Sequence, residues 1–184
     1  MPRRLTTPEP PLADGTVRLA PLSQEYVPEL LELIADDAIQ AYTLVPSGAG
    51  EEFLRGWVAR YEQGWREGTR AGFAIRSVTD DSLLGFAMIF HLDLAGREGE
   101  IGYAVAPAAR RRGVAGQTLE LLTRWCFDEI GLERIELQID ATNTGSERVA
   151  ERVGYRREGV RRSVHFKEGR RVDLGVWARL SADR

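Results

Sequence analysis

One stretch decides how this sequence is interpreted: Arg110-Arg111-Arg112-Gly113-Val114-Ala115-Gly116, which lies between a strand-like run and an apolar helical pattern. The first backbone N–H groups of a helix have no intrahelical partners and carry partial positive charge, so they attract anions. Gly113 and Gly116 lack a Cβ, which lets phosphate oxygens approach the chain, and arginines add charge-assisted hydrogen bonds. The stretch therefore predicts a phosphate-binding turn at a helix start; a solvated basic turn is the alternative interpretation.

Two common phosphate loops do not occur in the chain. The sequence has neither the G-x-x-x-x-G-K-[ST] pattern of P-loop proteins nor the G-x-G-x-x-G pattern of dinucleotide-binding folds. The phosphate turn therefore belongs to another class of α/β protein.

Periodic apolar residues outside this stretch predict an α/β domain in the order β-α-α-β-β-β-α-β-α-β-β. The expected strands cover Thr16–Leu22, Gly72–Val78, Leu83–Leu92, Glu100–Ala106, Arg134–Asp140, Arg157–His165 and Arg171–Leu180, with the last two joined at Glu168–Gly169. The expected helices cover about 23–36, Glu51–Glu67, Val114–Ile130 and Thr144–Val153.

Length and composition indicate one domain without a membrane span. The 184 residues fit one core, so residues 15–184 are expected to form a single domain, and the proline-rich residues 1–14 a loose tail. No apolar run approaches the ~18–20 residues that cross a bilayer, and the N-terminus lacks the apolar region of a secretory signal. A lone cysteine, Cys126, cannot form an intramolecular disulfide and lies on an apolar helix face, so we expect a core residue in a cytoplasmic protein.

The charge balance argues against nucleic acid as a partner. The net charge is −3, although 25 residues are basic and only Lys167 among them is a lysine. A nucleic-acid-binding domain that uses the arginine pairs would need net basicity, and it is the least favoured function class. Guanidinium groups can still bind individual phosphates in a fork geometry.

Several segments together resemble the GNAT N-acetyltransferases. Arg110-x-x-Gly113-x-Ala115 is similar to the [RQ]-x-x-G-x-[GA] acetyl-CoA motif of that family. Four further segments resemble its branch that acetylates ribosomal-protein N-termini: Glu100-Ile101-Gly102-Tyr103-Ala104-Val105, Gly131-Leu132-Glu133-Arg134-Ile135, Asn143-x-x-Ser146 and Val149-Ala150-Glu151-Arg152-Val153-Gly154-Tyr155. The resemblance extends over roughly 16–180, and the ordered series is more specific than any single segment.

The resemblance implies a mixed, splayed central sheet of about six to seven strands flanked by about four helices. Acetyl-CoA would be the co-substrate and would enter where the sheet splays, and no metal would take part. The pantetheine arm would pair with the backbone of Ala104, Val105 and Ala106 as an added strand does. The pyrophosphate would be held by Arg110, Arg111, Arg112, Gly113, Val114, Ala115 and Gly116.

Acetyl transfer to an amine needs a base, a stabilised oxyanion and a proton for the leaving thiolate. An α-amine has a pKa near ~8, so a carboxylate must remove its proton at neutral pH. The resemblance assigns this role to Glu100, with Glu98 as the nearest competitor, and the oxyanion to the backbone N–H of Ala104. A strand carboxylate paired with an arginine is the structural alternative for Glu100.

The proton donor for the thiolate departs from the common family pattern. Many GNAT enzymes use a tyrosine at the position of Ala150, so Ser146 is the expected substitute, and Asn143 would orient the cofactor or a water molecule. Both residues could instead be helix caps. His91 and His165 stand apart in the sequence and do not indicate a metal site.

The sequence thus predicts an enzyme that transfers acetyl from acetyl-CoA to a primary amine by direct attack in a ternary complex. The acceptor would be a protein N-terminal α-amine or a small-molecule amine. A non-catalytic acyl-CoA sensor or interaction module on the same fold is the alternative. A homodimer through the sheet edge or the C-terminal hairpin is also possible, and neither nucleic acid nor a membrane is expected as a partner.

Overall fold

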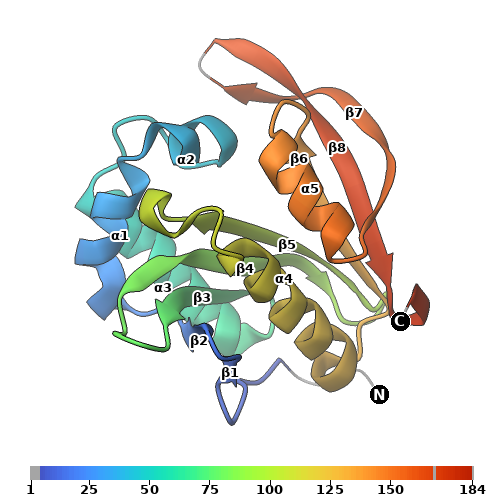
Figure 1. Cartoon of the computed structure of the whole chain (residues 1–184), viewed down its shortest axis with the longest axis horizontal. Coiled ribbons are helices and arrows are strands. Elements are labelled where there is room, and N and C mark those ends of the chain that lie inside the picture. Colours follow the sequence, from blue (N-terminus) through green and yellow to red (C-terminus); the bar gives the residue numbers. More distant parts are fainter. Residues whose placement is uncertain (1–4, 168, 184) are drawn as a thin grey trace.

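Alternating apolar residues on successive strands build one eight-stranded sheet in the computed structural model, which describes residues 5–167 and 169–183 (Figure 1). The strands are β1 (Leu12–Ala13), β2 (Val17–Pro21), β3 (Ala71–Ser77), β4 (Leu83–Asp93), β5 (Glu98–Val105), β6 (Arg134–Asp140), β7 (Arg156–Lys167) and β8 (Arg170–Leu180). They lie in the order β1-β2-β3-β4-β5-β6-β8-β7. Only β5 and β6 pair in parallel; the other neighbours in the described sheet are antiparallel.

Five α-helices cover the two faces of the sheet. They are α1 (Val27–Ile34), α2 (Asp37–Tyr42), α3 (Glu51–Glu67), α4 (Val114–Trp125) and α5 (Thr144–Arg152). A π-helical turn, Cys126–Ile130, continues α4, and short 3-10 turns cover Gln24–Tyr26, Pro107–Ala109 and Ser181–Asp183. The expected mixed, splayed sheet is therefore confirmed, with eight strands and five helices among the described residues instead of six to seven and four.

Two hydrophobic cores lie on opposite faces of the sheet because strand side chains alternate. Phe73 and Ile75 of β3 pack toward α4, in a core that includes Leu119, Leu122 and Trp125. Their neighbour Ala74 belongs to the second core, formed with α1, α2 and α3. The face covered by α4 and the face covered by α1–α3 thus have separate cores, although Trp65 of α3 also packs against Trp125 in the first one.

Helix ends follow the expected chemistry with two differences. Gly131 has a φ of 82° and ends the helix, as expected, but the last five residues before it form a π turn and not a regular α-helix. The expected helix over 23–36 is shorter, and α2 was not expected. Asp36 begins α2 by accepting a hydrogen bond from the Ile39 N–H at 2.9 Å.

The N-terminal residues differ from the expected loose tail. Residues 1–4 lie outside the described residues, but Leu12 and Ala13 pair with Leu19 and Arg18 of β2. Leu5 is buried in the core beneath α4. The prolines of this segment do not prevent docking, since an edge strand of two residues needs few backbone donors. Glu168, in the expected turn between the last two strands, also lies outside the described residues.

Candidate active site

The sheet opens between β5 and β6, and the candidate site lies in this opening. The two strands pair only from Glu98 opposite Arg134 to Glu100 opposite Glu136. Beyond that point β6 stays paired with β8, while β5 continues beside β4 to Val105. The opening widens into a cleft of about 1790 Å³, lined by α2, β4, β5, β6, α4, α5 and the β7–β8 hairpin.

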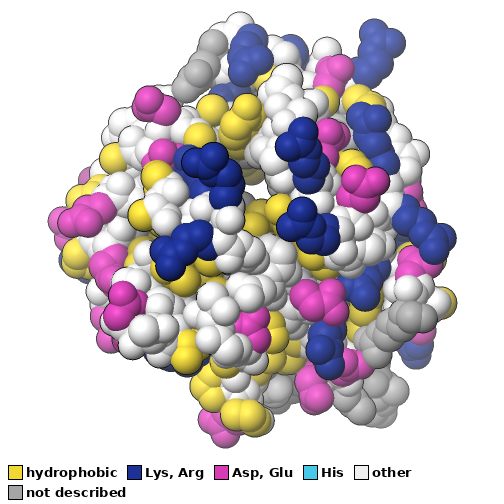
Figure 2. Space-filling model, in the orientation of Figure 1, with side chains coloured by type: hydrophobic (Ala, Val, Ile, Leu, Met, Phe, Trp, Pro, Cys, Tyr) yellow, Lys and Arg dark blue, Asp and Glu magenta, His cyan; other side chains and the backbone are white. Residues whose placement is uncertain are grey.

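The cleft has a cationic rim and an apolar interior. Figure 2 shows Lys and Arg side chains around a hollow in which hydrophobic atoms are visible. Arginines that line the cleft include Arg111, Arg124, Arg148 and Arg152, from the turn before α4, from α4 itself and from α5. This arrangement provides several positive charges for a ligand with more than one phosphate.

The start of α4 is built as the phosphate turn requires. Gly113 is the N-cap with a φ of 86°, a conformation that favours glycine, and a Cβ added there would find no protein atom nearer than the Gln117 side chain at 3.8 Å. Gly113, Val114, Ala115 and Gly116 line the cleft together with Arg110 and Arg111, whereas Arg112 does not. A phosphate could therefore reach the first amides of α4 through open space.

Arg110 has two protein partners in the cleft wall. Its Nε donates to the Val105 carbonyl at 3.1 Å, and its guanidinium forms an ion pair with Asp36 at the start of α2. Burial opposes ionisation of Asp36, but the hydrogen bonds from Arg110 and from the Ile39 amide outweigh it and lower the pKa of that carboxyl. Arg110 thus joins the phosphate turn to the helix across the cleft.

The backbone of β5 corrects two of the expected main-chain roles. The Ala106 N–H donates to the Leu84 carbonyl of β4 at 2.8 Å. Because backbone groups alternate sides along a strand, the N–H groups of Ala104 and Ala106 both face β4, and those of Tyr103 and Val105 face the opening. The expected pairing of a pantetheine arm with Ala104 and Ala106, and the oxyanion role of the Ala104 N–H, do not fit this register.

Glu100 is buried at the point where β5 and β6 separate. Its Oε2 accepts a hydrogen bond from Gln138 Nε2 at 3.1 Å and lies 3.0 Å from His91 Nδ1. Burial raises the pKa of Glu100, and the hydrogen bond from His91 opposes this shift. A carboxylate with a raised pKa inside a cleft suits a general base. Its competitor Glu98 is exposed and does not line the cleft.

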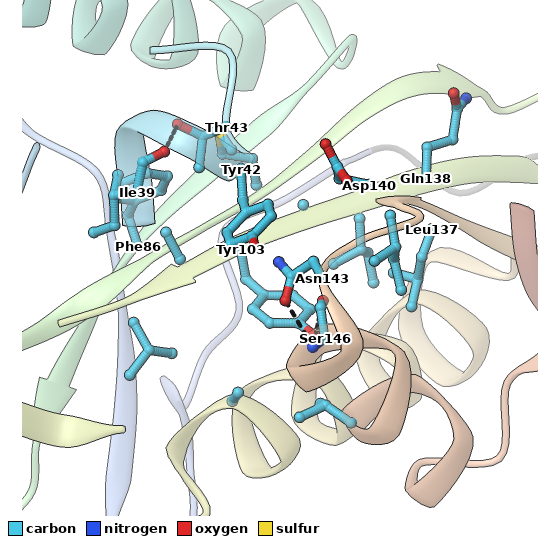
Figure 3. Close-up of a pocket in the computed structure, with 18 of the residues that line it drawn as sticks. Ile39, Tyr42, Thr43, Phe86, Tyr103, Leu137, Gln138, Asp140, Asn143 and Ser146 are labelled. Atoms are coloured by element: carbon cyan, nitrogen blue, oxygen red, sulfur yellow. Dashed lines mark hydrogen bonds between the residues drawn. The ribbon is translucent and has the colours of Figure 1, made fainter. Parts of the chain in front are cut away.

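Ser146 and Asn143 lie on the other side of the opening, at the start of α5 (Figure 3). Asn143 caps the helix by accepting from the Ser146 N–H at 3.1 Å, so its alternative role as a cap is present. The Ser146 hydroxyl lies 2.9 Å from the Tyr103 hydroxyl, and burial raises the pKa of Tyr103. Ala150, at the family's tyrosine position, is fully buried.

Glu100 and Tyr103 are presented to opposite faces of the sheet, because they are three residues apart on one strand. Glu100 shares its face with Glu136 and Gln138, while Tyr103 packs against the core beneath α4. The opening therefore has a carboxylate on one face and a hydroxyl pair on the other. This arrangement allows an amine and a thioester to enter from different faces and meet in the opening.

Sequence patterns assigned no side-chain role to three residues of this site: His91, Gln138 and Tyr103. Tyr103 lies inside the quoted strand motif, and its spacing from Glu100 could have indicated the opposite face. Gln138 lies between the buried Leu137 and Ile139 in the alternating pattern of β6, so the sequence indicates only that its side chain is on the face opposite theirs. His91 reaches Glu100 through a left-handed backbone conformation that no sequence pattern announces.

The family follows from comparison with known proteins. A family model described as an acetyltransferase (GNAT) domain matches residues 16–156 of this chain. The chain belongs to the GNAT acetyltransferases. The probable N-acetyltransferase YjcK of Bacillus subtilis is 28% identical over 127 residues, which cover 68% of this chain and 70% of that protein. This GNAT protein is therefore an N-acetyltransferase, and acetyl-CoA is its co-substrate.

Solved structures agree with the fold of this GNAT enzyme. RimL, a ribosomal L7/L12 alpha-N-protein acetyltransferase in complex with coenzyme A, superposes with a TM-score of 0.85 at 18% identity, covering 99% of this chain and 100% of that one. RimJ of Mycobacterium smegmatis, in complex with a CoA disulfide, gives 0.83 at 24% identity, covering 92% and 84%. The expected resemblance to the Rim-type branch is confirmed at the level of the fold.

Other chemistries find little support among the described residues. They contain no group of three or more His, Cys, Asp or Glu side chains arranged to hold a metal ion. Cys126 is fully buried in the core, and burial raises the pKa of its thiol, so it is not a reactive nucleophile. Within the described chain, no helix is long and apolar enough to cross a membrane.

Proposed function

We propose that this GNAT enzyme transfers acetyl from acetyl-CoA directly to a primary amine while both substrates occupy the cleft. The observation that carries the proposal is the opening between β5 and β6, with Glu100 on one face and the Tyr103–Ser146 hydroxyl pair on the other. Direct attack needs both substrates at one point. A cleft that is open to both faces of the sheet lets the two substrates meet at that point.

The cofactor-binding half rests on α4 and on the open edge of β5. The first amides of α4, from Gly113 to Gly116, would hold the pyrophosphate, and Arg148 and Arg152 add positive charge from α5. The backbone of Tyr103 and Val105 would pair with the pantetheine arm as a strand pairs with a sheet edge. Arg110 already donates to the Val105 carbonyl, so a pantetheine arm that pairs with Val105 would compete with Arg110 for this oxygen.

The transfer chemistry follows from the same residues. When bound, acetyl-CoA supplies an electrophilic thioester carbonyl. Glu100 removes a proton from the incoming ammonium, and a backbone N–H at the open edge, from Tyr103 or Val105, stabilises the oxyanion. Ser146 then gives its proton to the leaving thiolate and takes up the second proton of the attacking nitrogen, which restores its hydroxyl. Tyr103 supports Ser146 through their hydrogen bond. The raised pKa of Tyr103 keeps its hydroxyl protonated as a donor.

The acceptor is a protein N-terminal α-amine or a small-molecule amine. The name of RimL supports a protein N-terminus, because the fold and the strand motif are similar, while YjcK carries no acceptor in its name. The acceptor half is lined by Ile39 and Tyr42 of α2 on one side and by Gln138 of β6 on the other (Figure 3).

A thiol-release assay tests the proposal. The purified enzyme is mixed with acetyl-CoA and a panel of N-terminal peptides, amino acids and polyamines, and free CoA thiol is measured. We expect turnover with at least one primary amine and none with its N-acetylated form. Tight acetyl-CoA binding without turnover on any acceptor would favour the alternative of a non-catalytic acyl-CoA sensor.

The homodimer is a further part of this proposal. β7 is the long edge strand of the sheet, at the end opposite β1. It carries several arginines, and its pairing with β8 shifts register after Arg157 and again after Arg161. Such shifts and charges disfavour strand-to-strand pairing at an edge. A dimer would therefore use side chains of the β7–β8 hairpin and not a continuous sheet. Sedimentation velocity over a concentration series distinguishes a dimer from a monomer.

A further inference from the structure

We propose that His91 carries the proton that Glu100 removes from the amine out to solvent. The inference rests on the proposed function, with Glu100 as the base. An ammonium loses two protons when it becomes an amide. One of them ends on the CoA thiol, so the other must leave the enzyme in every cycle.

Glu100 has no direct exit for this proton. Its side chain is only 11% exposed, and the acceptor itself would fill the cleft in front of it. A base in this position would accumulate protonated enzyme unless a neighbouring group relays the proton. The His91 side chain is in contact with Glu100 Oε2 and is 76% exposed, so it joins the buried carboxyl to water.

Among the described side chains that are hydrogen-bonded to Glu100, only His91 can take up and release a proton. The other partner, Gln138, is an amide, and its orientation is fixed by Arg161, which donates to Gln138 Oε1 at 2.9 Å. Because a guanidinium can only donate, Gln138 must turn its NH2 group toward Glu100. Of the remaining charges nearby, Glu136 on β6 disfavours ionisation of Glu100 and is itself paired with Arg134.

The backbone is shaped to bring His91 to this position. Phe90 lies opposite Glu100 in the β4–β5 ladder, so the next residue of a regular strand would point to the other face. A bulge between Phe90 and Asp93 interrupts the ladder, and His91 adopts a φ of 48°. Left-handed backbone is unusual for a residue other than glycine, and bulges are frequent next to active sites, where they re-aim a side chain.

The relay has a balanced sequence of steps. Protonated Glu100 donates its O–H proton to His91 Nδ1, and the resulting imidazolium releases the Nε2 proton to water. Glu100 returns to the carboxylate, and His91 is left neutral with the proton on Nδ1. As the exposed ring turns toward water, Nδ1 loses this proton to water and Nε2 gains one from it, which restores the starting tautomer for the next cycle. An imidazole is suited to this role because either ring nitrogen can hold or release a proton near neutral pH.

Two variants separate relay from structure. His91→Asn keeps a side chain that tolerates left-handed backbone and can donate to Glu100, but it cannot pass a proton on. His91→Gly also suits the backbone and leaves space for added imidazole. His165→Asn, which changes the other histidine of the chain, is the matched control for imidazole effects.

Rates of thiol release are measured with and without imidazole, after subtraction of the non-enzymatic reaction. We expect kcat of His91→Asn to fall at least about 10-fold at pH 7 with the KM for acetyl-CoA changed less than about 2-fold. Imidazole should restore kcat of His91→Gly, more strongly as the free base increases with pH, and should leave His165→Asn unaffected.

Wild-type kcat in His91→Asn, or no imidazole response in a folded His91→Gly that binds acetyl-CoA normally, would overturn the relay. Either result would leave the proposed function intact, because the wild-type enzyme would still turn over. Failure of the proposed function is a different outcome, in which the wild type itself releases no thiol with any acceptor.

Discussion

The phosphate turn can be tested with a single methyl group. In Gly113→Ala the added Cβ meets no protein atom within 3.8 Å, so it extends into the open space of the cleft. The left-handed backbone at Gly113, with a φ of 86°, costs an alanine about 1–2 kcal/mol in folding free energy. That cost should lower Tm by about 2–8 °C in a chain of this size.

Gly131→Ala is the matched control for this strain. Gly131 has a φ of 82°, its Cβ position is also free of neighbours, and it does not line the cleft. We expect the two variants to lose similar stability. Only Gly113→Ala should bind acetyl-CoA more weakly, by about 10–100-fold, because a displaced phosphate loses charge-assisted hydrogen bonds worth about 1.5–3 kcal/mol.

Calorimetric titration of each variant with acetyl-CoA, alongside thermal melting, gives both quantities. Normal affinity in Gly113→Ala would show that the phosphates do not approach the start of α4. Equal weakening in both variants would trace the loss to folding and not to the turn. Either result refutes the placement of the pyrophosphate.

Four further outcomes are expected. Glu100→Gln should lower kcat by about 10²–10⁴-fold near pH 7, with a smaller deficit as free amine accumulates at higher pH; a profile parallel to the wild type would exclude Glu100 as the base. Burial raises the pKa of Glu100, so the stability that protonated Glu100 contributes is complete below its unfolded-state pKa and is lost as the pH rises through the folded-state pKa. Glu100→Gln should therefore have a higher Tm than the wild type at pH 8 but not at pH 4. An equal difference in Tm at both pH values would contradict this. Ser146→Ala should reduce kcat more than acetyl-CoA affinity, and Tyr103→Phe should do so less strongly; unchanged kcat in Ser146→Ala would remove it as the acid. Asp36→Asn keeps the cap but loses the ion pair with Arg110, so it should cost about 1 kcal/mol of folding free energy at pH 7. Because the pKa of Asp36 is lowered, this cost should shrink as the pH falls through that pKa, and a difference in Tm that stays constant over an acid titration would refute the pairing.

Sequence patterns predicted the elements of this fold because their signals are local. The turn before α4, the helix end at Gly131 and the alternation of β6 each depend on residues within a few positions of one another. α2 was missed because six residues carry little periodicity, and its cap at Asp36 becomes clear only with the Ile39 hydrogen bond. The docking of Leu5 was missed because it depends on the distant core beneath α4.

The site was less predictable because it depends on strand register. The sequence indicated Glu100 and the segment from Ala104 to Ala106, but which N–H groups face the opening is decided by the pairing of Ala106 with Leu84. His91 reaches Glu100 only because of a bulge in β4. Contacts between residues on different strands, or contacts made through irregular backbone, cannot be predicted from local patterns in one sequence.

The most direct test of the account is a crystal structure of the acetyl-CoA complex. We predict pyrophosphate oxygens within about 2.7–3.2 Å of main-chain nitrogens at the start of α4. The pantetheine arm should run along the Tyr103–Val105 edge, with the thioester carbonyl between Glu100 and Ser146. Phosphates bound away from Gly113, or a thioester outside the opening between β5 and β6, would contradict it.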